Sequence, residues 1–137
     1  MDGLISGGCF CGAIRYELSA DPVMSAHCYC RDCQRSTGGA MASLLIVPKA
    51  AFRITKGALK SYAVKADSGN EVAREFCPNC GSGILSRLAG MPDVVAVKAG
   101  SLDDSSGFKP TMNIYMSSAP AWAPVVLNLQ RFEKMPG

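Results

Sequence analysis

The chain is poor in histidine and tryptophan and has no long apolar run. It contains one histidine, His27, and one tryptophan, Trp122, among 137 residues. The single histidine excludes the DNA-binding finger built from two cysteines and two histidines. No apolar segment approaches the roughly 20 residues of a membrane-spanning helix, and the N-terminus has neither the basic head nor the apolar core of a signal peptide. We therefore expect a soluble, cytoplasmic protein.

The chain also lacks a cluster of like charges. Its 14 basic and 11 acidic residues give a formal net charge of +3, and the basic residues are interleaved with acids from Arg15 to Lys134. Nucleic-acid-binding surfaces gather Lys and Arg into a patch or stripe, so we expect no nucleic-acid partner. The sequence shows no internal repeat, low-complexity tract or interdomain linker, and 48% of its residues are hydrophobic. Residues 1–137 are therefore predicted to form a single domain.

Cysteine, in contrast, is abundant and clustered. The seven cysteines form a first pair, a triplet and a second pair, namely Cys9 and Cys11; Cys28, Cys30 and Cys33; Cys77 and Cys80. Closely spaced cysteines bring two or three sulfurs to one point, as a bound metal ion requires. The two pairs together supply the four thiolates of a closed, structural zinc site, whereas the triplet leaves one coordination position open, as in catalytic zinc sites. The count predicts one structural and one reactive zinc ion.

Two alternatives to metal binding fit the cysteine pattern less well. A disulfide framework would leave one of seven thiols unpaired, and neighbours in C-x-C spacing are poorly placed to bond each other. A redox-active C-x-x-C motif usually belongs to a thioredoxin-like βαβ unit, a pattern that this sequence does not contain. We therefore expect metal thiolate sites.

The pattern along most of the chain is that of short strands. Ile14, Tyr16 and Leu18 alternate with charged residues, which is typical of a half-buried strand. The sequence predicts further strands at 41–47, 52–55, 59–65, 71–76, 84–88, 93–99 and 112–116. We expect a mainly β fold.

One short helix is predicted near residues 31–37, which lack a β-rich run and are followed by two glycines. This helix would carry Cys33. In the extended segment before it, Cys28 and Cys30 face the same side, because side chains alternate along a strand. Three sulfurs can therefore converge from a strand end and a helix start.

The cysteine motifs resemble those of the glutathione-dependent formaldehyde-activating enzyme family. In order, they are G-C-F-C-G at 8–12, H-C-Y-C-R-D-C-Q at 27–34 and F-C-P-N-C-G at 76–81. The segments F-R-I-T-K-G at 52–57 and D-S-G-N at 67–70 are also similar, so the resemblance spans nearly the whole chain. It implies a β-tent fold, in which bound zinc holds distant parts of a sheet together, with one or two short helices.

The resemblance also implies an activity and a division of labour between the cysteines. In the family, the outer pairs hold a structural zinc and the middle triplet holds the catalytic zinc. The implied reaction is that of a carbon–sulfur lyase, which joins glutathione to formaldehyde or cleaves S-hydroxymethylglutathione. Because three thiolates leave zinc with little residual charge, we expect the second ion to be labile.

Five residues are candidates for binding glutathione, whose two carboxylates need cations or backbone donors. Arg31 and Arg35 lie within a turn of the triplet, Gly38 and Gly39 allow close backbone approach, and Trp122 lies in a tail whose ring could line the pocket. The alternatives are two solvated arginines and a tryptophan packed in the core, which is the commoner environment of a lone tryptophan.

Two further positions bear on the chemistry. His27 is a candidate proton carrier or outer partner of the metal, but its place in the strand points it away from the triplet, which favours a structural role. Asn113 stands where many relatives have histidine, which leaves the electrophile open.

A non-enzymatic zinc module for protein binding and a thiol-rich metal buffer are the alternative functions. The oligomeric state is open as well, with a homodimer as one option.

Overall fold

The chain folds mainly into β-strands, which form two sheets. The computed structural model describes residues 4–136. The smaller sheet has the order β1-β2-β5 and the larger sheet the order β11-β10-β3-β4-β9-β8-β7-β6. The smaller sheet contains β1 (Ile5–Gly8), β2 (Arg15–Leu18) and β5 (Phe52–Lys56). The larger sheet contains β3 (Met24–Cys28), β4 (Ala42–Pro48), β6 (Lys60–Lys65), β7 (Glu71–Phe76), β8 (Gly83–Leu88), β9 (Val94–Lys98), β10 (Met112–Ile114) and β11 (Gln130–Arg131).

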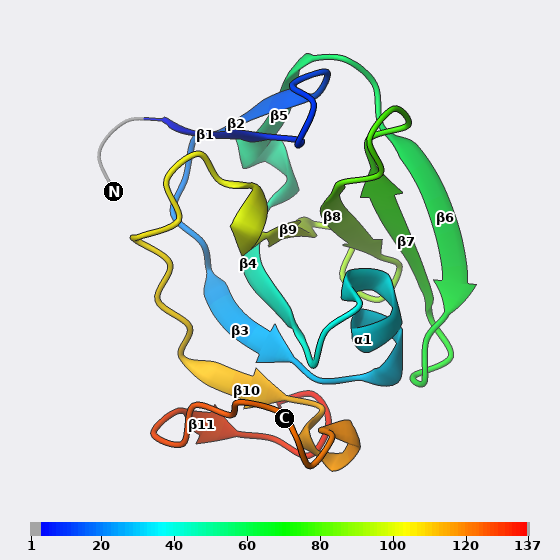
Figure 1. The fold of residues 1–137 in the computed structure, drawn as a ribbon, viewed down its shortest axis with the longest axis vertical. Coiled ribbons are helices and arrows are strands. Elements are labelled where there is room, and N and C mark those ends of the chain that lie inside the picture. Colours follow the sequence, from blue (N-terminus) through cyan, green and yellow to red (C-terminus); the bar gives the residue numbers. More distant parts are fainter. Residues whose placement is uncertain (1–3, 137) are drawn as a thin grey trace.

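The larger sheet curves from β10 and β11 round to β6, with the helix α1 (Arg31–Thr37) inside the curve (Figure 1). Its neighbouring strands are antiparallel except that β10 runs parallel to both β3 and β11. Three short 3-10 helices complete the structure, η1 (Lys49–Ala51), η2 (Ala99–Ser101) and η3 (Met116–Ser118). Within the described residues, no helix has both the length and the apolar composition needed to cross a bilayer. The expected mainly β class is confirmed.

The two faces of the larger sheet bury different apolar clusters, because successive side chains of a strand point to opposite sides. On β4, Leu45 and Val47 pack against the smaller sheet, through residues that include Tyr16. Leu44 and Ile46 of the same strand pack on the other face, among the cysteines of the triplet. Both faces of this central strand are therefore buried, and its sequence is a nearly continuous apolar run.

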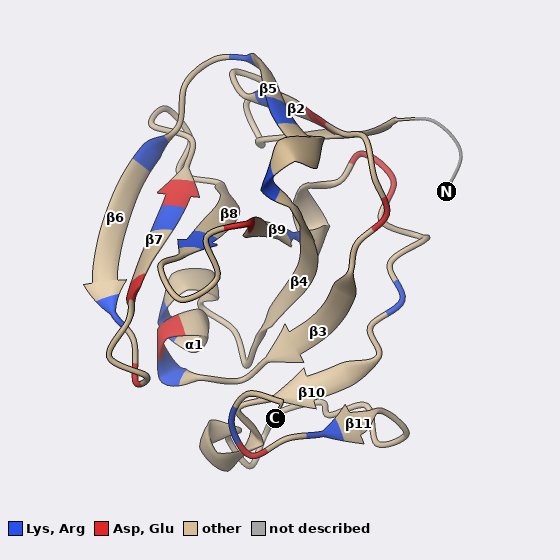
Figure 2. Ribbon diagram, turned by 180° about the vertical axis from the view of Figure 1, so that it is seen from behind, with Lys and Arg blue, Asp and Glu red and all other residues tan. Residues whose placement is uncertain are grey.

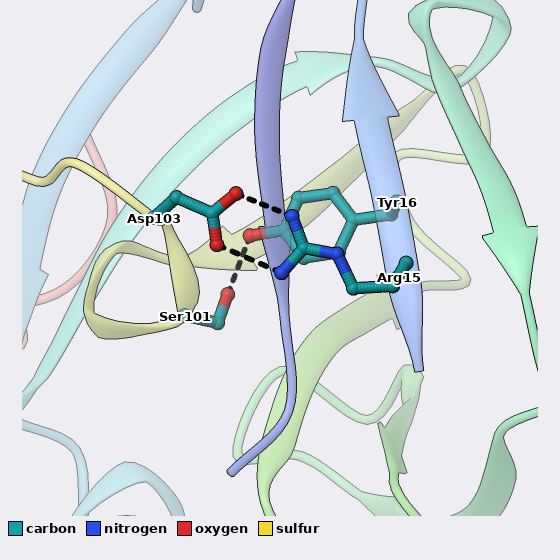
Figure 3. Close-up of polar contacts among 4 residues, drawn as sticks. All are labelled: Arg15, Tyr16, Ser101 and Asp103. Atoms are coloured by element: carbon teal, nitrogen blue, oxygen red, sulfur yellow. Dashed lines mark hydrogen bonds and ion pairs between the residues drawn. The ribbon is translucent and has the colours of Figure 1, made fainter. Parts of the chain in front are cut away.

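Two side-chain contacts fix the smaller sheet to the segment after β9 (Figure 3). Arg15 forms a double ion pair with Asp103, in which Nη1 donates to Oδ1 at 2.8 Å and Nη2 donates to Oδ2. The Tyr16 hydroxyl lies 2.5 Å from Ser101 Oγ. Gly7 of β1 permits this packing, because a Cβ at that position would lie 2.4 Å from the Tyr16 ring.

Charged side chains are distributed over the strands without regard to sign. Figure 2 shows basic and acidic residues close together on β6 and β7, which pair antiparallel. On β7, Arg74 lies between Glu71 and Glu75 in sequence, and Glu75 Oε2 accepts from Arg87 Nε of β8 at 2.6 Å. The charges on β7 are thus partly balanced by close neighbours of opposite sign.

The strands predicted from alternation and β-rich runs are confirmed, and the predicted helix at 31–37 coincides with α1. The strand predicted over 112–116 is too long. It ends at Ile114, because Tyr115 adopts a left-handed backbone with φ of 56° and η3 begins after it.

The sequence alone does not predict β1, β11 or most of β3. β1 contains two glycines, which are depleted in strands. β11 consists of two exposed edge residues, too few to show alternation. β3 carries the small or polar residues Ser25, Ala26 and His27 and is buried on both faces, so it lacks the usual apolar–polar rhythm.

Candidate metal centres and cavity

The first and second cysteine pairs meet in one cluster. Cys9 and Cys11 lie in the loop after β1, and Cys77 and Cys80 lie in the turn between β7 and β8. Their four sulfurs lie within 4.8 Å of one another, and we call them the four-sulfur cluster. Cys11 Sγ lies 3.7 Å from Cys9 Sγ and 3.8 Å from Cys77 Sγ. The fold therefore brings together residues that are 66 positions apart in the chain.

The spacing of the four-sulfur cluster fits a tetrahedral zinc ion. Four sulfurs bound to one zinc at about 2.3 Å would lie about 3.8 Å apart, whereas a disulfide needs about 2.05 Å. The backbone N–H groups of Ile14 and Cys80 donate to the sulfurs of Cys9 and Cys77, at 3.2 and 3.4 Å. Such donors favour the thiolate form, and a hydrogen bond with Ser82 lowers the pKa of Cys80 to about 5. This donor set can therefore hold zinc.

The triplet lies where β3 leads into α1. Cys28 is the last residue of β3, Cys30 caps the N-terminus of α1, and Cys33 lies in the first turn. The backbone N–H of Cys33 donates to Cys30 Sγ at 3.3 Å. This N–H lies in the first turn, where backbone donors have no partner within the helix, and the sulfur supplies one. At the other end, Gly38 has φ of 74° and donates to the Gln34 carbonyl, a common helix stop. These caps bring the three sulfurs within 4.8 Å of one another.

The three sulfurs of the triplet differ in their electrostatic surroundings. Hydrogen bonds from the thiols of Cys28 and Cys33 lower the pKa of Cys30 well below its usual range. The same hydrogen bond to Cys30 raises the pKa of Cys28. Both donor thiols are buried, and Cys30 is half-buried. Three converging sulfurs can hold a metal ion with one coordination position left for another ligand.

A cavity of about 600 Å³ opens beside the triplet. Its volume falls within the roughly 300–1,000 Å³ of typical small-molecule sites. All three triplet cysteines line it, and among the described residues no cysteine of the four-sulfur cluster does. Much of the apolar lining comes from the face of the larger sheet that carries the triplet, with Met24, Leu44, Ile46, Val72, Leu88, Ala96 and Ile114. The triplet is therefore accessible from the cavity, whereas the four-sulfur cluster is not, and the two clusters also differ in their number of sulfurs.

The cavity is bordered by segments that are distant in sequence. The β6–β7 hairpin and the C-terminal segment both contribute lining residues. They are joined by an ion pair in which Lys134 Nζ lies 3.0 Å from Asp67 Oδ2. Tyr115, with its left-handed backbone, also lines the cavity, and burial raises the pKa of its hydroxyl.

Sequence reasoning missed three cations in the lining, Lys65, Arg74 and Lys98. Lys98 is the last residue of β9 and follows four apolar residues, Val94 to Val97. A lysine at the end of such an apolar strand indicates a cation held close to the core, and this pattern could have identified Lys98 as a candidate. Burial lowers the pKa of Lys98, because the charged ammonium loses hydration.

The structure brings only one of the candidate glutathione-binding residues to the cavity. Arg31 lines it and donates through Nη1 to Gln34 Oε1. Arg35, Gly38, Gly39 and Trp122 are not among its lining residues. The alternative of a core tryptophan is wrong, because Trp122 is 68% exposed.

His27 and Asn113 lie on the opposite side of their strands from the cavity-lining Cys28 and Ile114. His27 Nδ1 is hydrogen-bonded to Ser43 Oγ at 2.9 Å. The Asn113 side-chain amide donates to the Val126 carbonyl at 2.9 Å. Asn113 therefore holds the C-terminal segment and does not face the triplet.

The sequence matches the model of one protein family, described as glutathione-dependent formaldehyde-activating enzyme, over residues 4–118. The chain belongs to this family. Among curated proteins, a Halomonas elongata member of similar sequence is named "Putative glutathione-dependent formaldehyde-activating enzyme"; it is 24% identical over 127 residues, which cover 89% of this chain and 81% of that protein. A crystal structure of a Rhodobacter sphaeroides protein superposes with a TM-score of 0.59 at 20% identity, over 93% of this chain and 98% of that chain. That likeness shows that the two chains share a fold.

Proposed function

We propose that the protein is a zinc-dependent carbon–sulfur lyase. It forms or cleaves S-hydroxymethylglutathione, or a related glutathione adduct, at the triplet. Membership of the glutathione-dependent formaldehyde-activating enzyme family supports a glutathione-related activity. We further propose that residues 1–137 form one β-tent domain, in which the four-sulfur cluster holds the structural zinc. Free thiolates persist in reducing compartments, which supports a cytoplasmic location.

One observation carries this proposal. Three sulfurs, not four, line a cavity large enough for a tripeptide thiol. A three-ligand site leaves a position for a substrate sulfur or oxygen, whereas a four-ligand site is closed. The contrast between the two clusters of the same chain therefore points to the triplet as the reactive centre.

The proposed reaction is the reversible addition of a thiol to an aldehyde. The thiol sulfur forms a bond to the aldehyde carbon, and the thiol proton passes to the aldehyde oxygen, which becomes a hydroxyl; cleavage is the reverse. A zinc ion bound by Cys28, Cys30 and Cys33 would supply Lewis-acid chemistry for either substrate. The backbone N–H of Cys33 donates to Cys30 Sγ, and such a donor favours the thiolate form that a metal ligand needs. Its apolar lining limits the access of water to the reacting atoms.

The test is the rate at which free glutathione exchanges with its S-hydroxymethyl adduct in a formaldehyde mixture, measured by exchange NMR. The addition also occurs without a catalyst, so only acceleration above that background counts. We expect acceleration with the zinc-loaded protein, loss of acceleration with Cys33→Ser, and wild-type rates with Ser61→Ala, an exposed change on β6 outside the cavity lining. Equal rates with and without the zinc-loaded protein would exclude the formaldehyde reaction.

A second candidate function is that of a zinc module that binds another protein. Trp122 and Leu127 are 68% and 88% exposed, and both lie in the segment after η3. Exposed large apolar side chains are enriched at interaction sites. For such a module, Trp122→Ala would reduce binding of the partner, and Cys33→Ser would leave that binding intact.

A further inference from the structure

Lys98 and Arg74 lie on the same face of the larger sheet. Arg74 of β7 pairs with Ser86 of β8, and Ser86 pairs with Ala96 of β9. Lys98 is two residues after Ala96, so its side chain leaves the same face. Both cations line the cavity together with the three triplet cysteines.

Both side chains carry a buried nitrogen with no hydrogen-bond partner. These atoms are Lys98 Nζ and Arg74 Nε. Within residues 4–136 no carboxylate forms an ion pair with either side chain. Three acids line the same cavity: Asp67 is paired with Lys134, and neither Asp32 nor Glu71 forms an ion pair with Lys98 or Arg74. A buried cation without a partner is costly, because it has lost its hydration.

The triplet offsets only part of this positive charge. Three thiolates with one divalent ion carry a net charge of −1, whereas Lys98 and Arg74 carry +2. The other charged lining residues cancel, Arg31 and Lys65 against Asp32 and Glu71, and Asp67 is paired with Lys134, so one positive charge remains in the cavity. An anionic group of a bound molecule would balance it and would give the buried nitrogens an acceptor.

We propose that Lys98 and Arg74 form an anion subsite that holds a carboxylate of the thiol substrate. The inference deepens the proposed function and rests on it, because glutathione carries two such carboxylates. It places the substrate carboxylate on the sheet side of the cavity. The exposed Arg31, in contrast, is engaged with Gln34 on the helix side.

The test compares two small thiols, 3-mercaptopropionate and its methyl ester, in which a methyl group replaces the negative charge of the carboxylate. Their affinities for the zinc-loaded protein are measured by isothermal titration calorimetry, with zinc content determined for each sample. A hydrogen bond to a charged group contributes enough to change affinity by about tenfold to a hundredfold. We expect the wild type to bind the acid more tightly than the ester by about that factor.

Three variants locate the effect. Lys98→Met should bring the ratio of acid to ester affinity close to one, and Arg74→Met should reduce it. Arg87→Met, which removes a cation paired with Glu75 from the neighbouring strand, should leave the ratio unchanged. If Lys98→Met weakened the acid and the ester equally, or only lowered zinc content, Lys98 would act on the thiolates and the subsite would be wrong.

The exchange measurement with glutathione and formaldehyde keeps the two proposals apart. A wild type that prefers the acid but does not accelerate the exchange would retain the subsite and overturn the lyase activity. Acceleration with equal affinities for the acid and the ester would support the lyase activity and overturn the subsite.

Discussion

Gln34 Nε2 donates to the carbonyl oxygen of Ser118 at 3.0 Å, across 84 positions of the sequence. The same amide nitrogen donates to the Tyr29 carbonyl at 2.7 Å. Gln34 follows Cys33 on α1 and is 6% exposed. One buried side chain thus ties the helix of the triplet both to the segment before it and to the segment after β10.

Replacing this glutamine should loosen the triplet. In Gln34→Ala, the buried Tyr29 carbonyl and the partly buried Ser118 carbonyl lose their side-chain donor, and an unsatisfied buried group costs about 1–3 kcal/mol. We expect a loss of about 2–3 kcal/mol in the free energy of unfolding and weaker zinc binding at the triplet. Chemical denaturation and competition with a zinc indicator measure the two effects. Gln130→Ala, on an exposed edge strand, is the control and should change neither. Unchanged zinc affinity in Gln34→Ala would show that the caps of α1 suffice to place Cys33.

The two cysteine clusters should respond differently to the same substitution. A structural zinc contributes free energy of folding directly, so Cys80→Ser should unfold the protein or lower its melting temperature strongly. Cys33→Ser should leave the protein folded and inactive. Melting curves followed by circular dichroism compare the two variants under identical zinc loading. Indistinguishable melting temperatures would contradict the division into a structural and a reactive site.

Metal removal should proceed in two phases. The triplet borders a cavity and offers three sulfurs, whereas the four-sulfur cluster offers a closed shell and lies outside that cavity. On titration with a chelator, we expect the first zinc to leave without change in far-ultraviolet circular dichroism. The second zinc should leave together with the secondary structure. Release of both ions in a single step that coincides with unfolding would argue against this order.

The ion pair between Arg15 and Asp103 should make stability depend on pH in one direction. The hydrogen bond from Arg15 lowers the pKa of Asp103 below the ordinary value of 3.8. A carboxyl group with a lowered pKa in the folded state stabilises that state above its ordinary pKa, and the contribution is lost as the pH falls through the lowered value. The wild type should therefore melt slightly higher than Asp103→Asn near neutral pH, and the difference should shrink with acidification.

The exposure of Arg15 and Asp103 determines how large the difference in melting temperature should be. Both side chains are partly exposed, so the difference should be small and should fall with added salt. Asp93→Asn, at an exposed position before β9, is the control, because it removes one carboxylate without removing an ion pair of the described residues. A difference between wild type and Asp103→Asn that grows on acidification would reverse the sign and contradict the assignment.

The sequence alone predicts the parts of this molecule that depend on local pattern. Alternation identifies β2, and the spacing of the cysteines predicts which residues share each cluster. The helix that carries Cys33 is recognisable from its lack of β-rich residues and the glycine that ends it. Each of these signals lies within a few consecutive residues.

The parts that the sequence does not predict depend on contacts between distant segments. Lys98 and Arg74 are 24 positions apart and meet the triplet only because β9, β8 and β7 are neighbours in the larger sheet. The candidates chosen for closeness in sequence, Arg35, Gly38 and Gly39, follow the helix away from the cavity lining. Nearness along the chain was therefore a poor guide to what faces the triplet.

The two cysteine clusters become complete at different times during synthesis. The triplet is contained in six consecutive residues, so its last ligand leaves the ribosome with Cys33. The four-sulfur cluster waits for Cys80, although its first pair emerges before the triplet. During that interval the nascent chain displays five cysteines and no closed site. With the proposed two zinc ions, an ion bound early to these sulfurs would have to be released to the four-sulfur cluster when the second pair arrives.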